Sequence, residues 1–354
     1  MKTETLLPVG KLDPGLAKPD APLDLSQVPG QSTVVDELGY YGLLMEETKD
    51  DPFQVLALAA ASTARVRLGT SVSIAFARSP YVTAMSAWTL QKLSAGRFEL
   101  GLGSQVRGHI RRRFGMPWRP PGPWMRDYVN AVKAIWHSWQ TETPLAFEST
   151  HYNLNLTVPL FTPAPITHPD IPIHVAAVNP YMCGVAAEVA EGVRLHPVSS
   201  ANYIQHTLLP TIRKHCPPGK RFEVCLKPLI ATAADNATLA ARTEVARARL
   251  AFYVSTPAYR LPFAQAGLED LTVQLSSLSK AKRWSEMAAC IPDDVLHQWV
   301  VIARYEDLAN TVQSRYADLI QRIEVSIPAG TSTERGMLKE ILTDIHSIKG
   351  SIQP

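Results

Sequence analysis

Several polar residues that are able to do acid–base or anion-binding chemistry come directly after short apolar runs. Glu46 and Glu47 follow the run 41–45, and Arg78 and His196 stand at the ends of later runs. A carboxyl group such as that of Glu47 works as a general acid or base when burial raises its pKa toward neutrality. A fixed guanidinium binds phosphate or carboxylate groups, and an imidazole titrates near neutral pH. If the runs are parallel strands, their carboxyl ends place these groups around one cavity.

Each of these residues also has an ordinary structural role as its alternative. A glutamate at the end of a strand is often exposed to solvent or salt-bridged, and the alternative for Arg78 is an ion pair with Glu46 or Glu47. His109 follows a glycine-rich turn and is a further candidate, although a lone histidine is more often structural than catalytic. With these alternatives open, Glu47, His109 and His196 are the candidate catalytic residues.

The stretch 66–118 contains a strand, helix, strand unit around which these groups are arranged. An apolar, β-branched run (66–76) is followed by a helical segment (80–93) and by a second apolar run (97–103). Parallel strands need such a crossover, and buried parallel strands are typically continuous apolar runs. The second run ends in Gly-Leu-Gly-Ser at 101–104, where small residues let backbone amides approach a ligand closely.

The whole chain alternates strands and helices in a way that predicts a (β/α)8 TIM barrel. The competing doubly wound sheet typically has a GxGxxG turn after its first strand, and the sequence has none. We expect one domain over residues 1–354, with inserted segments at about 141–171 and 236–316, after strands four and seven. The expected strands are 5–9, 41–45, 66–76, 97–103, 173–178, 192–198, 222–232 and 322–328.

Composition narrows the class of protein. An apolar fraction of 46% with 19% charged residues is typical of a globular protein, and a net charge of +3 is too small to indicate nucleic-acid binding. The basic cluster 107–113 is interpreted as a solvated helix face. No apolar segment approaches the roughly 18 to 20 residues of a membrane span, and no signal peptide is evident, so we expect a cytoplasmic protein. The scattered cysteines and histidines predict no metal site.

Several separate motifs resemble one known family. The segments AFARSP, LGLGSQ and RRFGMPW are similar to those of the bacterial-luciferase-like superfamily of flavin- and deazaflavin-dependent oxidoreductases. Farther along the chain, AFYVSTPAYR and LSKAKRWSEM resemble segments of its F420-dependent oxidoreductase group. The resemblance covers about residues 30 to 330, and the motifs occur in the expected order.

The resemblance implies where a cofactor would lie. In this superfamily the ring rests against a bulge in the third strand that contains a non-proline cis peptide, and the matching pair here is Ser71-Val72. The end of the fourth strand matches the segment that holds the ribityl and phosphate portion, and the end of the fifth matches another wall of the site. For Val178 the alternative is tight helix-to-sheet packing. The implied cofactor-binding residues are Ser71, Val72, Gly103, Ser104, Gln105, Ala176, Ala177 and Val178.

The chain also departs from the pattern of the family. Relatives that oxidise sugar phosphates place an Asp-His pair where this chain has Glu46-Glu47-Thr48, and relatives often have Gly-Glu where it has Gln105-Val106. The segment 301–307 lacks a Gly-x-Pro turn that is common in relatives. These departures keep open a barrel that has lost its cofactor, because a barrel core does not depend on those turns.

The expected function is hydride transfer between F420 and a small organic substrate. An FMN-dependent monooxygenase and a cofactor-free barrel that binds a ligand or catalyses a non-redox step are the alternatives. Expected substrate-binding residues are Glu46, Phe76, Arg78 and Tyr253, and for Tyr253 the alternative is a core position. The resemblance implies a homodimer that acts on a small molecule, with neither metal, nucleic acid nor membrane as a partner.

Overall fold

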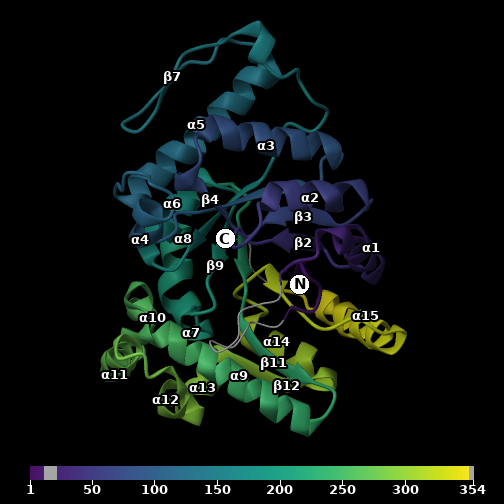
Figure 1. The fold of residues 1–354 in the computed structure, drawn as a ribbon, viewed down its shortest axis with the longest axis vertical. Coiled ribbons are helices and arrows are strands. Elements are labelled where there is room, and N and C mark those ends of the chain that lie inside the picture. Colours follow the sequence, from purple (N-terminus) through teal and green to yellow (C-terminus); the bar gives the residue numbers. More distant parts are fainter. Residues whose placement is uncertain (12–21, 351–354) are drawn as a thin grey trace.

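The computed structural model describes residues 1–11 and 22–350 and shows a closed barrel of parallel strands surrounded by helices (Figure 1). Each strand pairs in parallel with its neighbours, and the last strand pairs with the first, which closes the barrel. The predicted (β/α)8 TIM barrel is therefore confirmed. Its staves are β1 (Lys2–Leu6), β2 (Gly42–Met45), β3 (Arg67–Thr70) continued by β4 (Ser73–Ile74), β5 (Phe98–Gly103), β8 (Ile173–Ala177), β9 (Gly192–Leu195), β10 (Glu223–Leu226) and β13 (Arg322–Glu324).

Helices cover the outside of the barrel, and several begin at a side chain that caps their first turn. Asp51 accepts a hydrogen bond from the backbone N–H of Phe53, and Ser79 caps the helix that starts at Pro80. The covering helices are α1 (Val28–Leu38), α2 (Pro52–Ala61), α3 (Pro80–Leu93), α4 (Arg107–Arg112), α5 (Pro121–Thr141), α6 (Pro180–Val189), α7 (Ala201–Tyr203), α8 (Leu209–His215), α14 (Leu308–Tyr316) and α15 (Ser332–Ser347).

Two segments extend beyond the barrel at opposite ends of the view (Figure 1). One lies in the inserted segment expected at about 141–171 and carries an antiparallel hairpin of β6 (Phe147–Glu148) and β7 (Asn153–Leu154). The other has its own hydrophobic core, separate from the barrel core, which includes Phe263 and Trp299. It contains α9 (Asn236–Ser255), α10 (Arg260–Ala264), α11 (Glu269–Lys280), α12 (Trp284–Met287) and α13 (Asp293–Trp299).

The strand predictions differ from the structure in several places, and the predicted strands 66–76, 192–198 and 322–328 all run past the points where the observed strands end. The run 222–232 is two strands, because Pro228 interrupts it and β11 (Leu229–Ala233) leaves the barrel. There it pairs in parallel with β12 (Val300–Arg304), which lies in the inserted segment 236–316 and is not among the predicted strands. The first strand begins at Lys2 and ends at Leu6, before the predicted range 5–9 is complete.

Charged side chains fill the axis of the barrel. The guanidinium of Arg322, 3% exposed, makes ion pairs with Glu4, Glu99 and Glu223, and Arg194 makes a further pair with Glu4 at 2.8 Å. Burial by itself would raise the pKa of Glu4, but Arg194 and Arg322 outweigh it and hold this pKa below its ordinary value. The buried glutamates of the barrel interior are thus neutralised by the buried arginines.

Glycines make room for these side chains on the inner face. An added Cβ at Gly192 would lie 2.6 Å from the ring of His174, and one at Gly42 would lie 3.2 Å from the side chain of Glu4. Both glycines therefore sit where a larger residue would displace a buried polar group.

We predict that Arg322→Ala destabilises the fold by about 3 to 5 kcal/mol, because it leaves buried carboxylates without their partner. Urea unfolding measures the change. Arg283→Ala removes an exposed ion pair with Glu286 and is the control that should leave the unfolding midpoint nearly unchanged. Equal effects of the two variants would contradict a structural role for the interior charges.

Candidate functional site at the mouth of the barrel

A cavity of about 690 Å³ opens where the strands end. Most of its lining comes from the carboxyl ends of the barrel strands and from the turns that follow them, and the segment after β11 adds further residues. Ser71 and Val72 lie in the interruption between β3 and β4, and the peptide bond between them is cis, as the resemblance implied. All the expected cofactor-binding residues line this cavity: Ser71, Val72, Gly103, Ser104, Gln105, Ala176, Ala177 and Val178.

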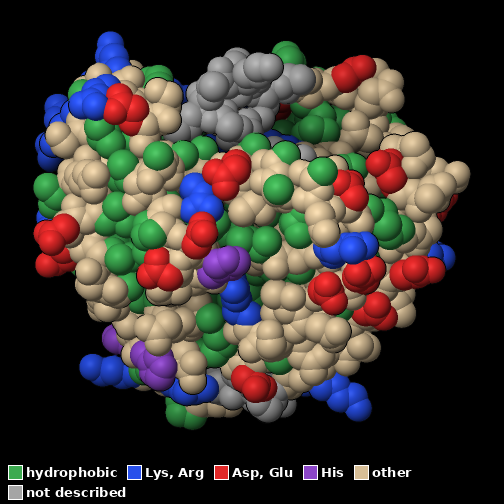
Figure 2. Space-filling view, turned by 90° about the horizontal axis from the view of Figure 1, so that it is seen from below, with side chains coloured by type: hydrophobic (Ala, Val, Ile, Leu, Met, Phe, Trp, Pro, Cys, Tyr) green, Lys and Arg blue, Asp and Glu red, His purple; other side chains and the backbone are tan. Residues whose placement is uncertain are grey.

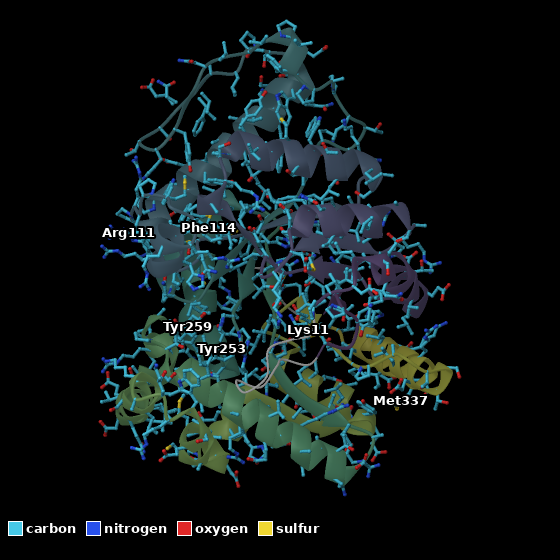
Figure 3. All side chains as sticks on the ribbon, in the orientation of Figure 1. Lys11, Arg111, Phe114, Tyr253, Tyr259 and Met337 are labelled. Carbon is cyan, nitrogen blue, oxygen red and sulfur yellow. The ribbon has the colours of Figure 1, made fainter. Side chains whose placement is uncertain are left out.

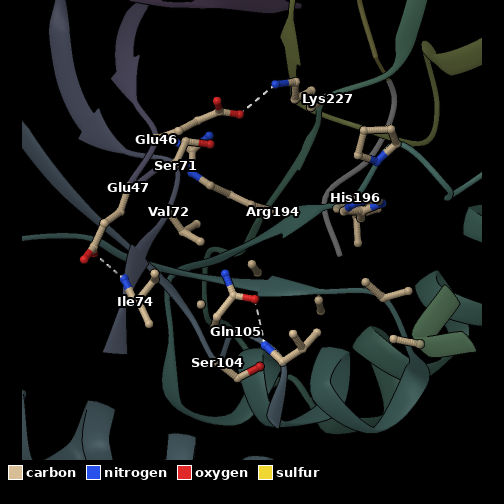
Figure 4. Close-up of a pocket in the computed structure, with 18 of the residues that line it drawn as sticks. Glu46, Glu47, Ser71, Val72, Ile74, Ser104, Gln105, Arg194, His196 and Lys227 are labelled. Carbon is tan, nitrogen blue, oxygen red and sulfur yellow. Dashed lines mark hydrogen bonds and ion pairs between the residues drawn. The ribbon is translucent and has the colours of Figure 1, made fainter. Parts of the chain in front are cut away.

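Small residues form one wall of the cavity beside Val72. An added Cβ at Gly103 would lie 2.5 Å from a methyl group of Val72 and 3.9 Å from the Cβ of Ala176. Gln105 has a positive φ of 55°, and its side-chain oxygen accepts a hydrogen bond from the backbone N–H of Val106 at 2.8 Å. At this wall the backbone itself borders the cavity (Figure 4). We call the wall formed by Val72, Gly103 and Ala176 the cradle.

Glu47 is held by groups of the strand beside it. Its carboxylate accepts hydrogen bonds from the Ser73 hydroxyl at 3.1 Å and the Ile74 backbone N–H at 2.7 Å, and it pairs with Arg78 at 2.5 Å. Arg78 also pairs with Asp51 at 2.9 Å. The ion pair that was the alternative for Arg78 is therefore confirmed, and these contacts favour a structural role for Glu47, although its side chain borders the cavity.

Three predicted site residues lie outside the cavity lining. Phe76 is 1% exposed and stacks on Trp124 with ring centroids 3.8 Å apart, so it belongs to the core. Arg78 is turned toward Glu47 and Asp51, and His109 is exposed on α4. The structure thus gives none of the three a place in the cavity lining, and the contact of Phe76 and Arg78 with substrate and the catalytic role of His109 stay predictions.

Glu46 and a second glutamate share a lysine at the cavity floor. Lys227 lies 2.9 Å from Glu46 and 3.4 Å from Glu324, and Lys11 lies 3.0 Å from Glu46. Burial would raise the pKa of Glu46, but Lys227 and Lys11 outweigh it and lower this pKa to about 2. Glu324 has weaker compensation, and burial raises its pKa to about 7. The two carboxyl groups therefore differ in charge near neutral pH.

His196 lies on the side of the cavity opposite Ser71 and Val72 (Figure 4). Burial, reinforced by the positive charge of Lys227 and Arg249, lowers the pKa of His196 to about 3. Its Nδ1 accepts a hydrogen bond from the backbone N–H of Val198 at 3.3 Å, which leaves the ring proton on Nε2. His196 is thus a neutral hydrogen-bond donor at physiological pH.

Two tyrosines from the segment after β11 complete this wall. The ring of Tyr259 lies 4.3 Å and that of Tyr253 4.9 Å from the ring of His196, measured between centroids (Figure 3). Arg249 donates a hydrogen bond to the Tyr253 hydroxyl at 3.0 Å. Tyr253 and Glu46 therefore border the cavity as expected, and their contact with substrate stays a prediction.

Sequence reasoning missed several cavity residues. Lys227 and Glu324 stand inside runs that were taken as continuous strands, and Arg194 stands inside β9. The signal that would have found them is the inward alternation of charged residues along neighbouring strands. Among the described residues, no group of three or more His, Cys, Asp or Glu side chains is placed to hold a metal ion. No helix in the described ranges has the length and apolar character needed to cross a membrane.

Comparison with known proteins gives related sequences. The family of luciferase-like monooxygenases matches residues 7–322. An uncharacterised protein of Mycobacterium tuberculosis is 38% identical over 306 residues, which cover 85% of this chain and 90% of that protein. A putative coenzyme F420-dependent oxidoreductase of the same species is 30% identical over 274 residues, which cover 71% of this chain and 76% of the relative.

Solved structures with the same fold have lower sequence identity. The F420-dependent tetrahydromethanopterin reductase of Methanopyrus kandleri superposes with a TM-score of 0.72 at 17% identity, over 98% of both chains. The EDTA monooxygenase of a Chelativorans species superposes with a TM-score of 0.73 at 12% identity, over 98% of this chain and 93% of that one. These likenesses confirm the barrel fold.

The raised pKa of Glu324 gives a testable pH dependence of stability. The folded-state pKa of about 7 exceeds the ordinary value of 4.5, so the stabilisation that is present below pH 4.5 is lost as pH rises through 7. The loss approaches about 3 kcal/mol. We predict that Glu324→Gln removes this loss when urea unfolding is compared at about pH 5 and about pH 8.

Glu191→Gln is the matched control, because Glu191 is a half-exposed carboxylate paired with Lys133 on the outer surface. It should keep the pH dependence of the unmodified protein. A Glu324→Gln variant that also keeps it would show that Glu324 is ionised in the folded protein across this range.

Proposed function

The chain belongs to the luciferase-like monooxygenase family, and on this premise we propose that it binds a flavin-type cofactor, F420 in preference to FMN, and transfers a hydride between that cofactor and a small organic substrate. The observation that carries the proposal is the cradle beside Val72, where an added Cβ at Gly103 would come within 2.5 Å of the Val72 side chain. Such a wall suits a flat ring that must approach the backbone closely.

The residues present fit a cofactor of this kind. A cavity of about 690 Å³ lies within the usual range for small-molecule sites, and its wall of Gly103, Ala176 and Ala177 leaves room for a ring. Ser71 and Val72 would back the ring, and the segment from Gly103 to Gln105 would hold the ribityl and phosphate portion. When bound, the cofactor supplies the carbon or nitrogen centre that accepts or donates a hydride.

The protein's own residues supply orientation and proton positions. His196 borders the cavity with its ring proton on Nε2, from which it would donate to a bound acceptor, and it stays neutral because its pKa lies near 3. Glu46 remains ionised between Lys11 and Lys227, while Glu324 holds or releases a proton near neutral pH. An oxygen-bearing substrate that accepts from His196 would therefore have a titratable carboxyl in the same cavity.

Similar proteins support F420 over FMN. The relative with an assigned cofactor at 30% identity is described as F420-dependent. A 5,10-methylenetetrahydromethanopterin reductase of Archaeoglobus fulgidus is 26% identical over 172 residues, 45% of this chain and 49% of that one. An FMN-dependent monooxygenase is the second candidate, since the same barrel occurs in the oxygenating constituent of 3,6-diketocamphane monooxygenase of Pseudomonas putida, which was solved in complex with FMN. A cofactor-free barrel, a homodimer and a cytoplasmic location stay predictions.

Titration of the purified protein with F420 and with FMN, followed by fluorescence, tests the proposal. We predict micromolar binding of F420 and weaker binding of FMN. Tighter binding of FMN would favour the monooxygenase. Binding of neither cofactor would contradict both redox functions and leave the cofactor-free barrel.

We further predict that Gly103→Ala weakens cofactor binding by at least about tenfold, because the added methyl group meets Val72 inside the cradle. The same titration measures the loss, and circular dichroism checks that the barrel is folded. Gly336→Ala adds a methyl group to α15 with nothing within 4 Å and is the matched control. Unchanged affinity in Gly103→Ala would mean that the cofactor lies elsewhere.

A further inference from the structure

Basic side chains continue from the cavity onto α4. Arg107 lines the cavity, and the guanidinium of Arg113 donates a hydrogen bond to the backbone oxygen of Thr48, another cavity residue, at 2.9 Å. The guanidinium of Arg112 folds back over the first turn of α4, since one of its nitrogens lies 3.4 Å from the position of a Cβ added at Gly108. We call Arg107, Arg112 and Arg113 the basic rim.

The basic rim has positive charge without acidic partners. None of the ion pairs found among residues 1–11 and 22–350 involves Arg107, Arg112 or Arg113, whereas Arg78, Arg126 and most buried arginines are paired. The face of the molecule seen from below in Figure 1 instead mixes side chains of both signs (Figure 2). A local excess of positive charge next to a cavity attracts an anion that extends out of it.

The side chain of the neighbouring Arg111 points in another direction than those of the basic rim. It belongs to the same short helix and is exposed, but its side chain points away from the body of the protein (Figure 3). Arg111 therefore has the same charge as the rim residues without their position at the cavity.

We propose that the basic rim binds the acidic tail of F420, an inference that rests on the proposed function of the cavity. The phosphate of F420 continues as a phosphodiester into a lactate and a chain of glutamates, which carries several carboxylates, whereas FMN ends at one phosphate. The turn 103–105, assigned to the phosphate, leads directly into Val106 and Arg107 at the cavity mouth. A tail that leaves the cavity here passes over Arg112 and Arg113.

The chemistry of this contact sets its strength and its salt dependence. Guanidinium groups pair with carboxylates through two parallel hydrogen bonds, but at an exposed surface each pair contributes little. Salt screens the attraction between exposed charges over a distance of roughly 8 to 10 Å at physiological ionic strength, so added salt weakens the contact. The rim thus adds a modest preference for the cofactor with a tail over FMN.

The test compares three probes by fluorescence titration at low and at high salt. They are F420 with several glutamates, the same cofactor without glutamates, and its riboflavin-like core without phosphate or tail. We predict that the glutamates improve affinity by about tenfold at low salt, and that high salt removes this gain. The variant Arg112→Gln should lose most of the gain, measured as the ratio of the affinities with and without glutamates, while binding of the core is unchanged.

Arg111→Gln is the matched control for Arg112→Gln, because it also removes one charge from the same helix, and it should keep most of the gain. Equal affinity for cofactors with and without glutamates, or equal losses in Arg111→Gln and Arg112→Gln, would overturn the role of the rim while leaving the proposed function intact. Failure of the core itself to bind would instead reject the proposed function, and the role of the rim with it.

Discussion

Charge compensation inside the barrel is the constraint on which the rest of the structure depends. Arg322 enters the axis from the last strand and meets carboxylates from β1, β5 and β10, so strands far apart in the sequence are joined through one guanidinium. Hydrophobic cores lie outside this axis, between the barrel and its helices. The buried arginines and glutamates therefore find their partners only when the barrel is closed and its strands are in this order.

The site is the continuation of this interior along each strand. Successive residues of a strand point to opposite faces, so the inward series moves in steps of two. Gly192 and Arg194 lead to His196, Glu223 and Cys225 lead to Lys227, and Glu99 and Gly101 lead to Gly103. The cavity floor therefore continues the alternation of acidic and basic residues in the barrel interior. The wall continues the series of small inward-facing residues. This is why a polar floor and a cradle for a ring occur in one cavity.

Much of this arrangement follows from the sequence. The apolar runs predicted the barrel, and the resemblance placed the cis peptide at Ser71-Val72 and the cradle at Gly103 and Ala176. Phe76 was misplaced because 66–76 was taken as one strand, whereas the strand is interrupted after Thr70 and gives way to a 3-10 turn at Ala75. The alternation of inward and outward residues does not continue across such an interruption.

The floor of the cavity was harder to predict. Lys227 and Glu324 stand within apolar runs, where an isolated charge usually indicates the solvent face of a strand. The ion pairs of Lys227 with Glu46 and Glu324 depend on the closure of the barrel, which brings the ends of β2, β10 and β13 to one cavity. The pKa of Glu324 depends in turn on how few charges compensate it there.

A crystal structure of the protein soaked with F420 tests the central claim most directly. The account predicts that the deazaflavin ring lies against Val72, Gly103 and Ala176 on one side of the cavity, with its phosphate at the turn 103–105. A ring bound elsewhere on the protein, or a cavity that stays free of cofactor at saturating F420, would contradict it.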